Sequence, residues 1–232
     1  MYFLVLIFPF LLSASIDESI IAFENVLHTL GDRISGKTII SLSPSTELII
    51  EVGDITEKNV DVIVNAANKE LQGGAGVCGA IFKTSGWNDL QMACNKFPAD
   101  SQGVRCPVGK ACITDSFDLS KKGIKKIIHA VGPDCRIVTN GSERSDLLRG
   151  AYLNSLRLAD SEGFSSIAFP FISSGIYACP KNLAVASPLK TIMDYVRQNP
   201  ETSLKQIYIV LFSQADKDEF DKQYRMLKMT EE

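Results

Sequence analysis

Residues 60–82 read VDVIVNAANKELQGGAGVCGAIF, and this stretch decides the fold. It opens with a nearly continuous apolar run that ends in two asparagines, Asn65 and Asn68, and a glycine-rich loop then leads into a helical pattern. A short apolar run of this kind is typical of a strand that is covered on both faces. Backbone N–H groups at the start of a helix can bind an anion such as phosphate. The stretch therefore predicts a buried strand followed by a phosphate-binding loop, with a purely structural turn as the alternative.

The same alternation of strand and helix patterns continues along the chain. We expect strands at residues 48–52, 60–65, 110–116, 126–131, 166–172 and 206–213. We expect helices at residues 77–85, 87–97, 146–162, 182–198 and 215–226. Strands that alternate with helices indicate a mostly parallel sheet with helices on both sides. The predicted fold class is therefore α/β.

The composition of the chain limits both its size class and its partners. Its 232 residues, 45% of them hydrophobic, suffice for one sizeable domain and are too apolar for a disordered chain. A net charge of -3 argues against a protein whose main task is to bind nucleic acid non-specifically. We also expect the protein to be a monomer. The six cysteines form no CxxC pair and the chain has two histidines, so we expect no metal site and no cofactor.

The first residues are the most apolar part of the chain. Residues 2–14 contain eleven apolar residues, and the first charged side chain is Asp17. The run is too short for a membrane-spanning helix, but its length suits a signal peptide with small residues at 13–15 as the cleavage site. The alternative is an N-terminal element that packs on the domain. We predict an apolar leader at 1–16, a helical extension and linker at 17–44, and the domain at 45–226.

The leader determines the expected location of the protein. With a functional leader the chain would be secreted or targeted, and without one it would stay in the cytoplasm. No stable membrane span is expected in the mature domain.

Three strand ends carry candidate ligand-binding residues, because ligands of such sheets bind outside the carboxyl ends of the strands. The first is the glycine-rich loop at 73–80. The second, at 169–177, ends in small residues that suit a second phosphate contact. The third contains Asp54, which could cap a turn or accept a hydrogen bond from an exocyclic amine. Two such loops and a carboxylate suggest a nucleotide diphosphate as the ligand.

At these residues the sequence resembles the macrodomain family of ADP-ribose-binding modules and ADP-ribosylhydrolases. The matching segments are GDIT (53–56), VDVIVNAAN (60–68), GGAGVCGAI (73–81), CPVGKACIT (106–114), IIHAVGP (127–133), SIAFPFISSGIY (166–177) and IYIVLFSQADKDEF (207–220). They occur in the family's order and cover about residues 45–225. The resemblance implies a three-layer α/β/α sandwich with a mixed, mostly parallel central sheet.

The resemblance also implies a ligand and its contacts. The ligand would be ADP-ribose, free or attached to ADP-ribosylated proteins. Asp54 would receive the adenine amine, the Ile55 backbone would frame the base, and Asn68 would meet the distal ribose hydroxyls. The diphosphate and distal ribose would lie between two loops, formed by Gly74, Ala75, Gly76, Val77 and Cys78, and by Ser173, Ser174, Gly175, Ile176 and Tyr177.

Four further residues receive structural or aromatic roles. Phe220, and in second place Phe212, would offer an aromatic face beside adenine, although core packing is the main expectation for Phe212. Asn65 is expected to brace the glycine loop from inside. His129 lies in an apolar strand and is expected to be a hydrogen-bonded packing residue.

Whether the chain is also an enzyme depends on the loop after Asn68. Many hydrolytic family members read GVDGAIH, and here the acidic and histidine positions are Cys78 and Phe82. However, GVC followed by an aromatic residue resembles the alphavirus branch, which hydrolyses without that acidic residue. A water held between the glycine loop and the substrate's own phosphate would then carry the reaction by positioning. The candidate catalytic residues are Asn68, Gly76 and Cys78, although Cys78 has no base beside it in the sequence and is a weak candidate nucleophile.

We therefore predict hydrolysis of mono-ADP-ribose from modified proteins, with esters of Asp and Glu as the expected linkage, and deacetylation of O-acetyl-ADP-ribose in the same pocket. The first alternative is a reader that binds ADP-ribose without cleaving it. The second is a nucleic-acid-binding or scaffold module with a degenerate pocket. Cys78 lies in the predicted ligand loop, where oxidation of its thiol should affect the pocket. Export of the chain and a reduced Cys78 thiol are therefore conflicting expectations.

Overall fold

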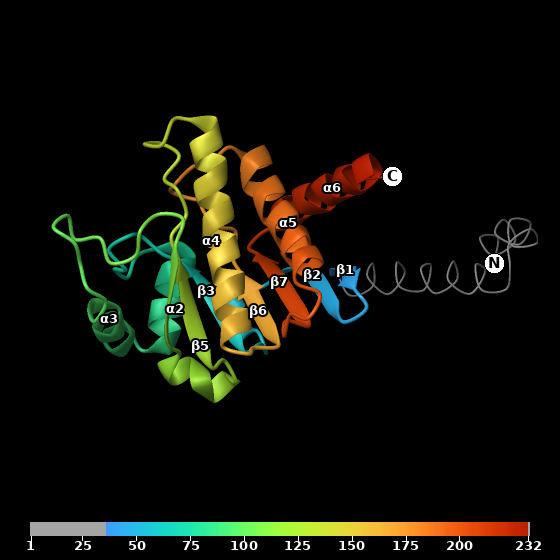
Figure 1. Cartoon of the computed structure of the whole chain (residues 1–232). Coiled ribbons are helices and arrows are strands. Elements are labelled where there is room, and N and C mark those ends of the chain that lie inside the picture. Colours follow the sequence, from blue (N-terminus) through green and yellow to red (C-terminus); the bar gives the residue numbers. More distant parts are fainter. Residues whose placement is uncertain (1–35, 232) are drawn as a thin grey trace, which may run out of the picture. The chain divides into compact units, whose positions relative to one another are not determined.

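The computed structural model describes residues 36–231, with side chains up to Met229 (Figure 1). The predicted leader at 1–16 and the predicted extension up to residue 35 lie outside the described residues. The strands are β1 (Thr38–Ser43), β2 (Thr46–Val52), β3 (Val62–Ala66), β4 (Ala111–Asp115), β5 (Lys126–Ala130), β6 (Ser166–Phe169) and β7 (Gln206–Leu211). The helices are α2 (Gly76–Ser85), α3 (Trp87–Asn95), α4 (Gly141–Ser161), α5 (Lys181–Gln198) and α6 (Gln214–Glu231), with short 3-10 helices η1 (Ile55–Glu57) and η2 (Phe117–Lys122).

The strands form one sheet in the order β1-β2-β7-β6-β3-β5-β4. Strand β2 is parallel to β7, β7 to β6, β6 to β3 and β3 to β5, whereas β4 runs antiparallel to β5. The sheet is therefore mixed and mostly parallel, and its central strands end at one common edge. The prediction of the sheet from the sequence is confirmed.

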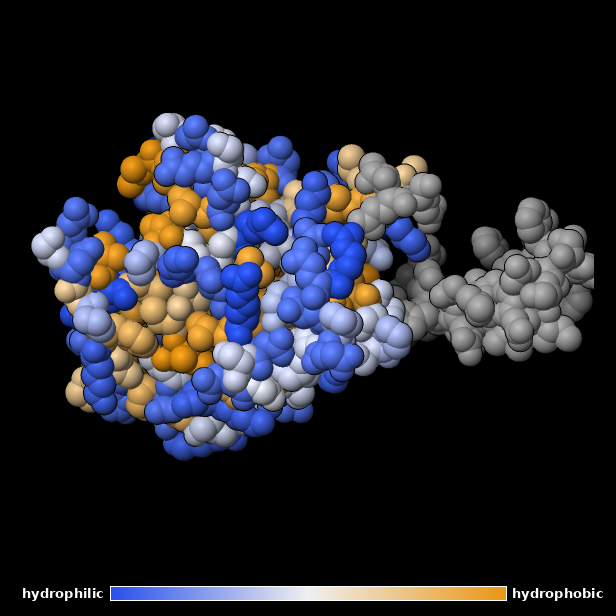
Figure 2. Space-filling model, in the orientation of Figure 1, coloured by the Kyte–Doolittle hydropathy of each residue, from blue (hydrophilic) through white to orange (hydrophobic). Residues whose placement is uncertain are grey.

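Side chains of successive residues in the central strands point to opposite faces of the sheet and so pack in different apolar layers. Val62 and Val64 belong to the apolar layer under α4 and α5, whereas Ile63 belongs to the layer under α2. This alternation follows from the period of two in a strand and explains why the central strands read as nearly continuous apolar runs. The fold is the predicted three-layer α/β/α sandwich. Figure 2 shows the outer sides of α4 and α5 largely hydrophilic, as expected of helices whose other side packs on a sheet.

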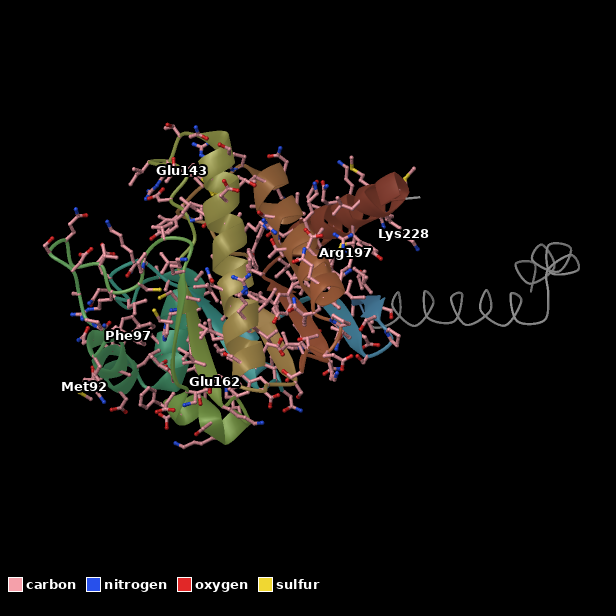
Figure 3. All side chains as sticks on the ribbon, viewed as in Figure 1. Met92, Phe97, Glu143, Glu162, Arg197 and Lys228 are labelled. Carbon is pink, nitrogen blue, oxygen red and sulfur yellow. A yellow bond between two sulfur atoms is a disulfide. The ribbon has the colours of Figure 1, made fainter. Side chains whose placement is uncertain are left out.

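The helices return across the sheet from the edge where the strands end. Glu143, in the first turn of α4, and Glu162, which directly follows α4, mark the two ends of this helix in Figure 3. Because β6 begins at Ser166, the end of α4 lies near the edge at which the central strands start. The other edge is consequently left to the loops that connect strand ends to helix starts.

The structure corrects one boundary of the predicted linker. Residues 38–43, assigned to the linker at 17–44, form β1 and are hydrogen-bonded to β2 at the end of the sheet. The segment reads TIISLS and is flanked by turn residues, and it lies on an outer strand that needs few apolar side chains. Its short and partly polar sequence therefore carried little strand signal. Among residues 36–231, no helix combines the length and apolar character that crossing a membrane requires.

Candidate functional site

A cavity of about 760 Å³ opens at the carboxyl ends of the strands, and we call it the strand-end cavity. Its volume lies in the range of typical small-molecule sites. The lining residues lie at or after the ends of five strands: Val52–Ile55 at the end of β2, Ala66–Asn68 and Gly74–Cys78 at and after the end of β3, Gly132 after β5, Pro170–Tyr177 after β6, and Val210, Phe212 and Asp216 at and after the end of β7. All of the predicted ligand-binding residues except Phe220 line this cavity.

The glycine loop presents the start of α2 to the cavity. The cap position, Ala75, makes no side-chain hydrogen bond, and the first turn contains no acidic residue. The positive end of the helix dipole and the first backbone N–H groups are thus available to an anion. Gly76 has a φ of 62°, a left-handed conformation that favours glycine. A side chain on Gly79 would place its Cβ 2.5 Å from the Gly74 carbonyl oxygen, so the loop can close tightly only with glycine there.

Asn68 holds the beginning of this loop. Its Nδ2 donates to the carbonyl of Gln72 and its Oδ1 accepts from the Gln72 amide, both at 2.9 Å. The side chain also lines the cavity. Asn68 therefore fixes the turn at 68–72 while its side chain remains in the wall of the cavity.

Cys78 lies beneath the loop and is almost fully buried. The Asn65 Nδ2 lies 3.6 Å from its Sγ, so Asn65 braces the loop from inside, in the position that the sequence predicts. Burial raises the pKa of the Cys78 thiol, against weaker lowering by hydrogen bonds from Asn65 and the Gly74 backbone. The thiol is therefore protonated at neutral pH, which makes it a poor nucleophile.

His129 is a neutral, hydrogen-bonded packing residue, as the sequence predicts. It is fully buried and does not line the cavity. Its Nδ1 lies 3.2 Å from the Asn65 Nδ2, and its Nε2 lies 2.9 Å from the Thr114 Oγ1. The Asn65 amide nitrogen can only donate, so the His129 Nδ1 accepts this hydrogen bond. The His129 Nε2 therefore carries the ring proton and donates to the Thr114 hydroxyl oxygen. Burial lowers the pKa of His129 to about 4.

The low pKa of His129 predicts a loss of stability in mild acid. In the unfolded chain this histidine binds a proton near pH 6.5, whereas in the folded protein it does so near pH 4. The stabilisation is complete above pH 6.5 and decreases as the pH falls towards 4, by about 2 kcal/mol between pH 7 and pH 5. Urea unfolding at the two pH values measures it. A His129→Gln variant should lose most of this dependence, and an unchanged slope in that variant would contradict the assignment.

The loop after β6 covers the cavity from the other side. Ser173 has a φ of 62°, which is strained for a residue with a side chain. Its Oγ is buried without a hydrogen-bond partner among the described residues. This oxygen lies against Gly132, where an added Cβ would approach it to 2.2 Å. Gly132 therefore provides the space in which the Ser173 loop sits.

Asp54 combines the two roles that the sequence left open. Its Oδ1 accepts hydrogen bonds from the backbone N–H and the hydroxyl of Thr56, both at 2.8 Å, and so caps η1. Its Oδ2 has no hydrogen-bond partner among the described residues, and the side chain lines the cavity. The second carboxylate of the cavity, Asp216, is engaged by the Ser213 hydroxyl at 2.7 Å and by the Lys181 Nζ at 3.1 Å. Asp54 is thus the carboxylate that keeps an oxygen for a ligand.

The match to a family model identifies the chain. The model described as "Macro domain" matches residues 64–187, which include the glycine loop and the Ser173 loop. The chain belongs to the macro domain family. An O-acetyl-ADP-ribose deacetylase of Escherichia fergusonii is 44% identical over 167 residues, which cover 71% of this chain and 87% of that protein.

Two solved macro domains have the same fold. The Oceanobacillus iheyensis macrodomain with ADP superposes with a TM-score of 0.75 at 34% identity, covering 84% of this chain and 97% of the other. The Trypanosoma brucei macrodomain in complex with ADP-ribose superposes with a TM-score of 0.66 at 27% identity, covering 79% of this chain and 73% of the other.

The structure of this macro domain corrects the placement of two aromatic residues. Phe220 was expected to face the ligand, but its side chain is fully buried and packs edge-on against Phe171 at a ring distance of 5.1 Å. Phe212 was expected mainly in the core and only in second place beside the ligand, but it is 97% exposed and lines the cavity. The reason is that β7 ends at Leu211, one residue earlier than the apolar run suggests, so Phe212 leaves the sheet. Phe220 lies on the face of α6 that packs on the core.

Further residues of the macro domain's site were not predicted from the sequence. Gly132 and Asp216 line the cavity, and a disulfide joins Cys135 to Cys179, which flanks the Ser173 loop. Gly132 lies in the quoted segment IIHAVGP directly after a predicted strand, so its position could have placed it at the ligand-binding edge of the sheet. The pairing of two cysteines 44 residues apart was not signalled by any spacing. Within the described part of the chain, no group of three His, Cys, Asp or Glu side chains could hold a metal ion.

Proposed function

We propose that this macro domain binds ADP-ribose in the strand-end cavity. The order of the strands supports an orientation for the ligand. Asp54 and Phe212 follow β2 and β7, the two loops follow β6 and β3, and Gly132 follows β5. These five strands are consecutive in the sheet, so the cavity extends across four strand spacings, about 19 Å. An elongated dinucleotide-like ligand fits this length, with its base at the β2–β7 end.

Each part of the ligand then meets suitable groups. The adenine amine would donate to the open Oδ2 of Asp54, and the exposed ring of Phe212 would lie beside the base. The diphosphate would receive N–H groups from the start of α2 and from the Ser173 loop. The distal ribose would lie near Asn68 and Tyr177. The main support for this arrangement is the first turn of α2, whose backbone N–H groups have no side-chain cap and no acidic residue beside them.

We further propose that the protein hydrolyses esters of ADP-ribose. The support is its 44% identity to an O-acetyl-ADP-ribose deacetylase. An acetyl ester on the ribose and an ester between ADP-ribose and an Asp or Glu side chain both join the sugar to a carboxyl group. The same pocket and the same positioned water would serve both substrates. Removal of mono-ADP-ribose from modified acidic side chains is therefore the proposed cellular reaction.

The distribution of charge supports a substrate-assisted mechanism. The two carboxylates that line the cavity, Asp54 and Asp216, follow β2 and β7 and so stand at the proposed base end. The protonated Cys78 thiol and the neutral, buried His129 supply no general base at the distal end. A water held by Asn68 and the loop backbone would instead be activated by the phosphate of the substrate. Positioning and N–H stabilisation of the developing charge would provide the rate enhancement.

The test combines binding with turnover. We expect calorimetry to show ADP-ribose binding, and mass spectrometry to show loss of ADP-ribose from Glu- or Asp-modified protein and of acetate from O-acetyl-ADP-ribose. Asp54→Ala should weaken binding by about 10- to 100-fold, because a charge-assisted hydrogen bond contributes roughly 1.5 to 3 kcal/mol. Asp54→Asn, which keeps an acceptor for the η1 cap, is the matched control and should retain the melting temperature of the wild type.

Two results would redirect the proposal. Tight binding with fully retained ADP-ribose on the modified protein would leave the reader function. Absence of any ADP-ribose binding would favour the nucleic-acid or scaffold module with a degenerate pocket.

A further inference from the structure

The Cys135–Cys179 disulfide joins two loops across a strand that lies between them. Cys135 follows β5 and Cys179 ends the loop after β6, whereas β3 separates these two strands in the sheet. The bond therefore spans the end of β3, the strand that carries the glycine loop. A covalent link at this point ties together two of the segments that enclose the strand-end cavity.

The disulfide packs against a residue that lines the cavity. Both cysteines are buried, at 4% and 7% exposure, and they pack with Ala184 and Phe171. Phe171 itself lines the cavity. Two backbone hydrogen bonds run beside the bond: the Cys135 N–H donates to the Tyr177 carbonyl at 2.8 Å, and the Cys179 N–H donates to the Ser173 carbonyl at 3.0 Å. The position of Tyr177 thus depends directly on the backbone of Cys135.

The Ser173–Tyr177 loop is held in a strained conformation. Ser173, its first residue, and Ala178, the residue directly after it, have φ angles of 62° and 47°, in the left-handed region that residues with a side chain seldom adopt. The Ser173 hydroxyl is buried without a partner among the described residues. Strain and an unpaired hydroxyl persist only where the surroundings fix the backbone. Cys179 follows Ala178 directly, so the disulfide acts at the end of the strained segment.

The Cys135 side of the bond is a firm anchor. The Arg144 side chain, in the first turn of α4, donates to the carbonyl of Cys135 at 2.5 Å and to that of Val138. Asp134 and Arg136 form an ion pair on either side of Cys135, with Nη2 and Oδ2 2.6 Å apart. The loop after β6 is consequently attached to a segment that is fixed to α4.

We propose that the Cys135–Cys179 disulfide is a positioning element that holds the Ser173–Tyr177 loop in its ligand-binding conformation, so that its reduction weakens ADP-ribose binding. This inference rests on the proposed function of the cavity. In the reduction, a dithiol gives two electrons and two protons: the S–S bond breaks, Cys135 and Cys179 become thiols, and the dithiol becomes a disulfide. The released loop leaves its strained conformation, and ligand binding must restore it.

The expected effect follows from the population of the binding conformation. If the released loop holds that conformation about one tenth of the time, the dissociation constant for ADP-ribose rises about tenfold. Calorimetry on the oxidised protein and on protein reduced with dithiothreitol measures this change, with alkylation and mass spectrometry to confirm the state of both cysteines. Reoxidation should restore the affinity. A Cys135→Ser/Cys179→Ser double variant should bind as the reduced protein does and be insensitive to dithiothreitol.

Two control variants separate positioning from general stability. Cys112→Ser removes a free thiol that does not line the cavity and should retain the full response to reduction. Ile192→Val weakens the core under α5 without altering a cavity residue and should leave the affinity unchanged at a temperature where it is folded.

The outcomes distinguish this inference from the proposed function. Equal affinity of the oxidised and reduced proteins would overturn the inference and leave the proposed function intact. If the oxidised protein bound no ADP-ribose, the proposed function would be wrong, and hydrogen exchange would still decide the role of the bond. Faster exchange of the Ala178 and Cys179 amides after reduction would support the positioning role, and unchanged exchange would reject it.

Discussion

Replacing Gly175 with glutamate is expected to weaken ADP-ribose binding by about a hundredfold while the fold is retained. Gly175 lines the strand-end cavity, an added Cβ would meet nothing within 4 Å, and its φ lies outside the left-handed region. The new side chain therefore fits without strain. Its carboxylate would face the proposed diphosphate, and like charges about 6 Å apart repel by roughly 3 kcal/mol at an effective dielectric constant of about 20. Calorimetry with ADP-ribose measures the loss.

Two matched variants separate charge from bulk in this experiment. Gly175→Gln adds a side chain of the same size without the charge and should weaken binding much less. Gly141→Glu adds the charge at an open position in the first turn of α4 that does not line the cavity, and it should bind ADP-ribose as the wild type does. Raising the salt concentration should recover part of the affinity of Gly175→Glu, because ions screen the repulsion. If Gly175→Glu binds normally, the phosphate does not lie beside this loop.

The sequence predicts the local parts of this site because they depend on the backbone. Asn68, Gly74 and Gly76 follow a strand that is nearly continuously apolar, and such a strand belongs in the centre of a parallel sheet. The loop after it then reaches the edge where ligands of such sheets bind. Glycine positions in a tight loop also leave a direct trace in the sequence. For these residues, the position in the motif was sufficient to place them at the cavity.

The features that the sequence did not predict depend on contacts between distant segments. Phe212 and Phe220 both follow an apolar strand, and their exposure is decided by where β7 ends and by which side of α6 packs on the core. Strand β1 owes its place to hydrogen bonds with β2 rather than to its own short sequence. The disulfide depends on two loops that meet across β3. None of these relations has a periodicity or spacing within one segment.

The disulfide and the buried Cys78 thiol together address whether the protein could be exported while Cys78 stays reduced. Structural disulfides persist in oxidising compartments and are rare in the cytosol. The predicted leader at 1–16, outside the described residues, would direct the chain to such a compartment. Cys78 is buried under the glycine loop, and this burial raises its pKa, so little of the reactive thiolate is present. An oxidising compartment is therefore compatible with an intact Cys78 beside a closed Cys135–Cys179 bond.

Alanine substitutions at the two corrected phenylalanines are expected to have opposite consequences. Phe220→Ala should lower the free energy of unfolding by about 3 to 5 kcal/mol, because it leaves a cavity in a core layer where the ring is fully buried. Phe212→Ala should leave the free energy of unfolding unchanged, because the ring is 97% exposed. Urea unfolding without ligand measures both values, and a milder Phe220→Leu variant provides folded protein if Phe220→Ala does not fold.

Binding should show the reverse order. Stacking of a base on an aromatic side chain contributes roughly 1 to 3 kcal/mol, so Phe212→Ala should weaken ADP-ribose binding about tenfold or more. Phe212→Tyr keeps the ring and should restore the affinity. Phe220→Leu, measured where it is folded, should bind nearly as the wild type does, since Phe220 does not line the cavity and packs on Phe171, which does. Strong loss of affinity in Phe220→Leu with normal binding in Phe212→Ala would mean that the base lies elsewhere in the cavity.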